Sequence, residues 1–381
     1  MSDSRLMGLL TRPGPWTCAY VDGPGMLPQV EEEALRRSVR ERLEEIGAPA
    51  EDASAIESAL ESRNGMPSPS ARVVLASAGR VEFDQGFVGA RTGPERLSYG
   101  PVPTILPLLR HLSAATRYIV VETSRDGADI RLETSGRRGS DAESEVEGGT
   151  GNLTKVQAGG MAHAAYHRYA ENVWKHNQSE VAAAVSGLIR EQHPTFVAIS
   201  GDVRARQLLI ESLTDAEREL IVEVDVHTRA DGADSTELDS AIAESIAERM
   251  RITVTEVRDR AATDNGSGGA EGIGEVTAAL QQARVETLLL DSRMLDDGRT
   301  LLALDPAPWV AADESESLGA VVVDSIPAAE ALARAAILTD ARVLIDEDEP
   351  AEEDAPRESR PVRDPLAVLR WADEADAGDG N

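Results

Sequence analysis

The sequence predicts an α/β fold of three domains, on two observations. Short apolar runs of strand length alternate with longer segments in which apolar residues recur at helical spacing, an alternation typical of layered α/β proteins. The length of 381 residues also fits two or three domains at roughly 150 residues each. The expected domains are residues 1–112, residues 113–232, and residues 233–345 together with 364–373.

The first expected domain combines strands with charged helices. The apolar run 72–78 (RVVLASA) is followed by the turn Gly79-Arg80 and then by 81–87, so the two runs predict a hairpin. The other elements expected here are a strand at 16–21 and helices at 30–46 and 51–62.

The second expected domain opens with another hairpin, 117–123 and 128–133, around an Asp-Gly turn. Residues 136–154 are rich in Gly, Ser and acidic residues and predict a mobile loop. A long helix at 160–191 should end before His193-Pro194, because the residue before proline disfavours helix. The elements expected after it are a strand at 195–200, a helix at 204–213 and a strand at 220–226.

The third expected domain begins with a long helix at 235–261. The elements that follow are helices at 273–283 and 328–338 and strands at 285–291, 319–323 and 341–345. Residues 346–363 (DEDEPAEEDAPRESRPVR) are charged and contain prolines, so they predict a disordered acidic insert. Residues 364–372 (DPLAVLRWA) regain an apolar pattern and predict a final helix.

Composition excludes several classes of protein. The chain has 68 acidic residues and 38 Lys and Arg, so its net charge is −30. This charge argues against a nonspecific nucleic-acid coat protein and against binding to anionic membranes. The single cysteine, Cys18, cannot form an internal disulfide, and its surroundings carry no catalytic motif. We find neither a signal peptide at the start nor an apolar run long enough to span a membrane, so a cytoplasmic protein is expected.

One segment, 155–178 (KVQAGGMAHAAYHRYAENVWKHNQ), departs from this acidity. It carries a formal charge of +2, contains both lysines of the chain, and includes three histidines and three aromatic residues. A basic, aromatic helix start led by glycines suits contact with a phosphate backbone and with bases. The alternative is an amphipathic helix with a mixed solvated face, because apolar residues in the segment also recur at helical spacing.

Metal and cofactor motifs are weak by comparison. His163 and His167 have the i,i+4 spacing of a zinc helix, but the usual glutamate and a third ligand are missing. The glycines of 266–274 follow a polar stretch instead of a strand, so they indicate a flexible loop and not a dinucleotide site. No metal and no cofactor are therefore expected.

Three segments carry a family resemblance. Residues 159–162 (GGMA), followed by Tyr166, Arg168 and a long helix, resemble the Gly-Gly-Gln region of archaeal and eukaryotic class-1 release factors. Residues 274–290 are similar to the helix and strand of the C-terminal domain of release factors and Pelota, and 364–371 to its closing segment. The pattern resembles the bacterial release-factor-like group, which includes Balon-like hibernation factors and relatives of Vms-type tRNA hydrolases.

The resemblance implies an RNase H-like central domain, followed by a C-terminal α/β/α domain like that of kink-turn ribosomal proteins. It also implies binding at the ribosomal A site in hibernation or rescue, with an elongation-factor GTPase as a further partner. The residues expected to contact large-subunit RNA or the P-site tRNA end are Lys155, Gly159, Gly160, Met161, His163, Arg168, Lys175 and His176.

One departure from the family decides between binding and catalysis. The position of the catalytic glutamine is occupied by Met161, whose thioether cannot donate a hydrogen bond. The resemblance therefore implies ribosome binding without peptide release. Two alternatives stay open: a peptidyl-tRNA hydrolase that uses Gln157 or a histidine to orient water, and an interaction module with no link to the ribosome.

Overall fold

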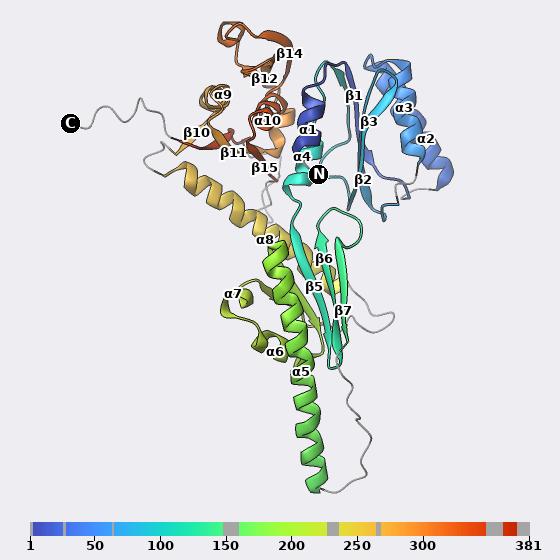
Figure 1. Cartoon of the computed structure of the whole chain (residues 1–381). Coiled ribbons are helices and arrows are strands. Elements are labelled where there is room, and N and C mark those ends of the chain that lie inside the picture. Colours follow the sequence, from blue (N-terminus) through green and yellow to red (C-terminus); the bar gives the residue numbers. More distant parts are fainter. Residues whose placement is uncertain are drawn as a thin grey trace, which may run out of the picture. The chain divides into compact units, whose positions relative to one another are not determined.

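The computed structural model describes residues 3–25, 28–62, 65–147, 160–226, 236–263, 268–347 and 361–371. The chain forms two compact units, one made of residues 114–250 and one made of 1–113 together with 251–381. Both units combine sheets with helices, so the α/β class with several sheets is confirmed (Figure 1).

The unit of residues 114–250 is built on a five-stranded sheet of order β7-β6-β5-β8-β9. The strand β5 pairs antiparallel with β6 and parallel with β8, and β9 continues the parallel half. This mixed order, 3-2-1-4-5 in the numbering of the unit, is the arrangement of an RNase H-like sheet. The strands are β5 (Arg117–Ser124), β6 (Gly127–Thr134), β7 (Ala142–Glu147), β8 (Phe196–Gly201) and β9 (Ile221–Glu223).

Helices cover both faces of this sheet because successive side chains of a strand point to opposite sides. Ile119 and Val121 of β5 pack with residues of α5 (Gly160–Gln192) and α6 (Val203–Ser212). The intervening Tyr118 and Val120 face α8 (Thr236–Ala261), through which the chain passes into the other unit. A short helix, α7 (Asp215–Arg218), starts with a capping box formed by Thr214 and Glu217.

The larger unit begins with an antiparallel sheet of order β3-β2-β1-β4. One face carries α2 (Gln29–Glu45) and α3 (Ala50–Glu61), which bury Val39, Leu43 and Ile56 against it. Residues of α1 (Asp3–Leu10) and α4 (Leu106–Ser113) pack with the opposite face. The strands are β1 (Trp16–Asp22), β2 (Ser70–Ser77), β3 (Arg80–Val88) and β4 (Arg96–Gly100).

The C-terminal part of the same unit contains two sheets. The first has the order β10-β16-β11-β15 and the second the order β13-β12-β14. Its strands are β10 (Gly269–Glu271), β11 (Val285–Asp291), β12 (Thr300–Asp305), β13 (Val310–Ala311), β14 (Val321–Pro327), β15 (Arg342–Asp346) and β16 (Leu366–Leu369). Its helices are α9 (Ile273–Gln281) and α10 (Ala328–Leu338), with 3₁₀ turns η2 (Ser292–Asp296) and η3 (Glu314–Glu316).

A single hydrophobic core joins the N-terminal and C-terminal parts of this unit. It runs from Leu6 and Leu108 to Leu288 and Leu332 without interruption. At its centre lies α10, which is buried along residues 328–336, and its many alanines let helices α1, α4 and α9 approach it. The carboxylate of Glu330 accepts hydrogen bonds from the backbone N–H groups of Ile105 and Leu106, and so caps the start of α4.

The final apolar segment forms a strand, so the helix predicted at 364–372 is wrong. Residues 366–369 form β16, which lies between β10 and β11 and pairs antiparallel with both. A four-residue apolar run in the middle of a sheet has no strand periodicity that distinguishes it from a buried helix. The predicted mobile loop is also wrong at 142–147, where the exposed strand β7 pairs with β6. Most of the predicted acidic insert, 348–360, lies outside the described residues.

Candidate functional site

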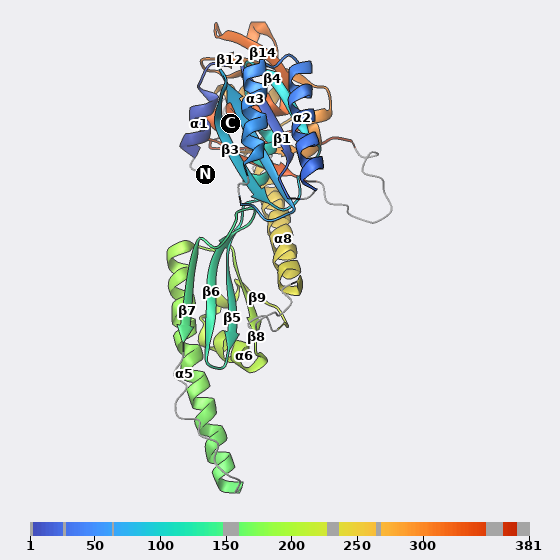
Figure 2. The same ribbon diagram turned by 90° about the vertical axis from the view of Figure 1, so that its right-hand side faces the viewer.

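The helix α5 is far longer than the sheet it packs on. It has 33 residues, and Figures 1 and 2 both show its N-terminal half extending beyond the strands of its own unit. Among the described side chains of α5, which begin at Glu171, the first to bond to the sheet are Asn177 and Gln178, and Glu171 pairs with Arg204 of α6 at 2.5 Å. At about 1.5 Å per residue, the stretch from Gly160 to Asn177 reaches roughly 25 Å past that attachment. We call residues 160–176 the arm.

The base of the arm is held by three hydrogen bonds to three consecutive residues at the end of β5. Thr123 Oγ1 donates to Gln178 Oε1 at 2.8 Å, and Gln178 Nε2 donates to the carbonyl oxygen of Ser124 at 2.7 Å. Asn177 Nδ2 donates to the carbonyl oxygen of Arg125 at 3.1 Å. The side chain of Gln178 is completely buried, so losing these bonds would leave polar groups without water.

A second contact clamps the helix just before this attachment. The guanidinium group of Arg125 lies over the ring of Trp174, with 4.6 Å between its central carbon and the ring centroid. Arg125 Nε also lies 3.1 Å from Asp202, the residue that caps α6. Trp174 is thus half-buried at the base of the arm and contributes to fixing its direction.

The structure distributes the predicted contact residues along the arm. Lys175 and His176 are exposed beside the base, where His176 Nε2 lies 3.6 Å from Glu180 Oε1. Gly160, Met161, His163 and Arg168 lie in the outer turns of α5, and their side chains are outside the described part of the chain. Lys155, Gln157 and Gly159 precede the helix and lie outside the described residues as well. The grouping of these residues as an RNA-contact site therefore remains a prediction.

Two further observations on the described ranges concern metal sites and membrane-spanning helices. Within these ranges, no three His, Cys, Asp or Glu side chains come together as a metal site would require. Among the same residues, no helix combines the length and the apolar character needed to cross a membrane.

Comparison with known proteins identifies the segment that carries the arm. Residues 117–267 match the family model for bacterial archaeo-eukaryotic release factor family 2. The chain is release-factor-like over this segment. The matched residues include the whole sheet of the unit, all of α5 and the clamp at its base.

Two proteins of Mycobacterium tuberculosis are similar over most of the chain. Rv2629 of strain H37Rv and MT2704 of strain CDC 1551 are each 26% identical over 350 residues, covering 88% of this chain and 90% of the relative.

Solved structures of release factors and Pelota proteins are also similar. An archaeal translation termination factor, aRF1, is 16% identical, with 97% of both chains covered and a TM-score of 0.25. Archaeal Pelota, in a ribosome-bound arrangement with ABCE1, is 13% identical with 97% and 93% covered and a TM-score of 0.37. Dom34 of S. cerevisiae is 10% identical with 80% of both chains covered and a TM-score of 0.37.

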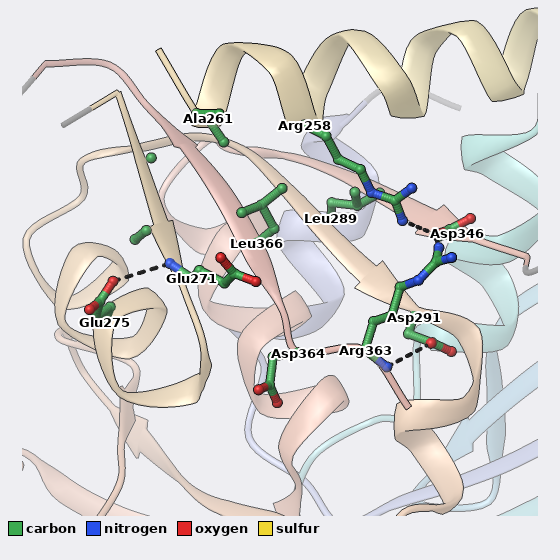
Figure 3. Close-up of a pocket in the computed structure, with 13 residues that line it drawn as sticks. Arg258, Ala261, Glu271, Glu275, Leu289, Asp291, Asp346, Arg363, Asp364 and Leu366 are labelled. Carbon is green, nitrogen blue, oxygen red and sulfur yellow. Dashed lines mark hydrogen bonds and ion pairs between the residues drawn. The ribbon is translucent and has the colours of Figure 1, made fainter. Parts of the chain in front are cut away.

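The chain also has a charged pocket of about 570 Å³ at the C-terminal sheet (Figure 3). Asp291 and Asp346 end the parallel strands β11 and β15 in register, at the edge of a sheet where ligands often bind. The carboxylate of Asp346 accepts hydrogen bonds from Arg258 and Arg363, at 2.5 and 2.8 Å. Figure 3 shows both guanidinium groups beside it. Sequence reasoning missed this pocket, although an aspartate after each buried strand was a signal for it.

Hydrogen bonds in this pocket favour the ionised form of Asp291. Burial opposes the charged form of Asp291, but hydrogen bonds from Arg293 and from the backbone N–H of Arg363 hold the pKa of Asp291 below its usual value. Asp291 and Asp346 are both paired with arginines, an arrangement that stabilises the end of the sheet.

Proposed function

We propose that this chain is a ribosome-associated factor that occupies the A site and directs the arm toward the peptidyl transferase centre. The observation that carries the proposal is the geometry of α5: a helix anchored at Asn177 and Gln178 and extending about 25 Å outward to Gly160. The match of residues 117–267 to a release-factor family model supports it, because that match contains the arm and its base.

A stiff arm suits this role because it delivers its tip to a fixed place. The hydrogen bonds of Gln178 and the stacking of Arg125 on Trp174 tie the helix to the β5–β6 turn at successive helical positions. A contact made at the tip therefore does not have to order the base at the same time, which lowers the entropic cost of binding.

The charge pattern fits a narrow contact with RNA. Lys155 and Lys175 are the two lysines of a chain with a net charge of −30, and both belong to the segment that leads into and along the arm. Broad acidity disfavours any other approach to a phosphate backbone. We infer that large-subunit RNA or the P-site tRNA end meets this segment alone.

Because of Met161, the proposed factor occupies the A site but does not release the peptide. Met161 stands where release factors carry the catalytic glutamine, and a thioether cannot donate a hydrogen bond to a water or an oxyanion. The proposal is thus a cytoplasmic factor of hibernation or rescue that excludes other ligands from the A site. Delivery by an elongation-factor GTPase is part of the same proposal and rests on the family resemblance.

Charge reversal tests the RNA contact. Lys155→Glu with Lys175→Glu is expected to weaken binding to vacant ribosomes at least about tenfold, and to reduce the salt dependence of binding by about two charges. Arg190→Glu is the matched control, since it makes the same change at an exposed position near the other end of α5. Equal affinities for the wild type, the double variant and the control would contradict the proposal and favour an interaction module without a ribosome link.

The alternative is a peptidyl-tRNA hydrolase, in which Gln157 or a histidine orients the attacking water. Peptide release from a stalled complex distinguishes the two functions. We expect no release above background from the wild type, whereas release that is lost in Gln157→Ala would establish the alternative.

A further inference from the structure

Arg334 of α10 is a buried cation without a carboxylate partner among the described residues. Only 4% of its surface is exposed. One terminal nitrogen, NH1, donates to the carbonyl oxygens of Leu304 and Trp309, at 2.9 and 3.3 Å, and the ring of Trp309 lies 5.5 Å from the guanidinium carbon. The Nε–H group has no hydrogen-bond acceptor within the described part of the chain. Burial lowers the pKa of Arg334, against the weaker opposing effect of Asp305.

Two other buried arginines, Arg72 and Arg206, have the carboxylate partners that Arg334 lacks among the described residues. Arg72 is equally buried and forms an ion pair with Asp84 at 2.6 Å. Arg206 is paired with both Glu223 and Asp225, at 3.3 and 2.6 Å. A buried guanidinium group is costly when its charge is not compensated, and acidic residues are abundant in this sequence. Within the described residues, no carboxylate forms an ion pair with Arg334, so its guanidinium group can take an anionic ligand.

Arg334 lines a pocket of about 380 Å³. The pocket lies within the larger unit, where the N-terminal part meets the C-terminal part. Its walls are formed by residues 10–15 and 99–103, with Asp305 and Val323. The first two segments contribute four prolines and Tyr99, which are flat, apolar surfaces suited to packing against a ring. The volume lies in the range of small-ligand sites.

We propose that this pocket binds a small molecule that joins an oxyanion, a phosphate or a carboxylate, to a flat ring. The oxyanion pairs with the guanidinium group of Arg334, which presents a planar fork of donors that matches such a group. The ring lies against Tyr99 and the prolines. This site is separate from the arm and independent of the proposed ribosome binding.

The charge of Asp305 should affect the affinity of the pocket for an anion. Its carboxylate is exposed at the pocket and lies beyond ion-pair distance of Arg334. It repels an incoming anion through solvent, so Asp305→Asn should tighten binding about two- to fivefold. A purely structural role for Arg334 would give no such effect.

The test is isothermal titration of the full chain with AMP, inorganic phosphate, benzoate and adenosine. We expect saturable binding of AMP, weaker binding of phosphate and of benzoate, and none of adenosine. Arg334→Gln should weaken AMP binding at least about tenfold. Arg342→Gln, the same change at an exposed position of β15, should leave it unchanged.

Two results would overturn the proposal: no saturation by any oxyanion probe up to about 10 mM, or equal affinity of AMP and adenosine. If Arg334→Gln does not fold, Val323→Trp, which fills the pocket from the strand β14, decides the question. Unchanged AMP binding in Val323→Trp would place the ligand elsewhere and contradict the assignment.

Discussion

The hydroxyl group of Thr123 donates a hydrogen bond of 2.8 Å to the side-chain amide of Gln178, and both residues are fully buried. This bond joins the central strand β5 to the helix α5 at the point where the arm begins. It is one of the contacts that attach α5 to the sheet at this point.

Replacement of Gln178 by leucine is expected to destabilise the chain by about 1–3 kcal/mol, because the Thr123 hydroxyl and the Ser124 carbonyl oxygen lose their partner in a buried place. Urea denaturation followed by circular dichroism measures the change. Ser179→Ala, at the adjacent exposed position of α5, is the control and should shift the midpoint very little. A midpoint for Gln178→Leu as high as that of the control would show that the base is not held in this way.

Glu330 should make stability fall as pH rises. Burial raises the pKa of Glu330 to about 7, although the backbone N–H groups of Ile105 and Leu106 lower it. Between the usual value near 4.5 and about 7, the folded chain therefore retains a proton that the unfolded chain has lost. The contribution of this group is present in full below that window and is lost as pH rises through it.

The measurement for Glu330 is the free energy of unfolding at about pH 5 and about pH 8, in the wild type and in Glu330→Gln. The variant should lose less stability between these values than the wild type. Glu41→Gln, at an exposed position of α2, should keep the wild-type difference. The interpretation fails if Glu330→Gln and wild type have the same pH dependence.

His111 should act in the opposite direction. Its ring stacks on Phe87 with centroids 4.2 Å apart, and its Nε2 lies 2.8 Å from the Tyr20 hydroxyl oxygen. Burial and the charge of Arg110 lower the pKa of His111 to about 4, from 6.5. The unfolded chain therefore binds more protons between these values, and stability is lost as pH falls through that window.

His111→Phe retains an aromatic ring but cannot titrate, so it should lose less stability than the wild type between about pH 7 and about pH 4.5. Unfolding in urea at both values measures the difference. His176→Gln replaces a histidine at an exposed position of α5 and should behave like the wild type. An unchanged acid sensitivity in His111→Phe would contradict the prediction.

Met161→Gln tests whether the arm retains the geometry of a release factor. The substitution restores a donor at the position of the catalytic glutamine, so we expect peptide release from a ribosome-bound peptidyl-tRNA to rise above the wild-type background. Met161→Leu, which restores no donor, should remain at background. If Met161→Gln binds ribosomes but releases nothing, the tip does not occupy the catalytic position of the family.

Local patterns predicted most elements of the fold. The alternation at 117–123 and 128–133 gave the first two strands of the RNase H-like sheet, and His193-Pro194 marked the end of α5 at Gln192. The strands β4, β10, β12 and β13 and the helices α1, α4 and α7 were missed, because they are short and lie among polar, glycine-rich or proline-rich residues.

What the sequence could not predict is mainly non-local. The buried helix α10 was predicted at 328–338, but its packing with α1 and α4 depends on segments more than 200 residues away. The cap of α4 by Glu330 and the ion pair of Arg96 with Asp296 belong to the same class. Such partners leave no trace in spacing or composition.

Prediction of the residues at the base of the arm was limited in the same way. The exposed Lys175 and His176 were named from composition, but the buried Gln178 was not, because composition does not distinguish a buried polar residue from an exposed one. Its spacing did contain a signal. Gln178 lies three and seven residues before the buried Val181 and Val185, on the face of α5 that packs against the sheet.

The most direct measurement of the central claim is cleavage of ribosomal RNA from a probe at the arm tip. Cys18 is the only cysteine; it is buried, and burial raises its pKa to about 12, so Met161→Cys introduces the one reactive thiol. An iron chelate tethered there should generate hydroxyl radicals that cut large-subunit RNA around the peptidyl transferase centre. The same chelate at Arg190→Cys should cut elsewhere. Cuts near the peptidyl transferase centre only from position 161 are the predicted result, and their absence from ribosomes that do bind the protein would contradict it.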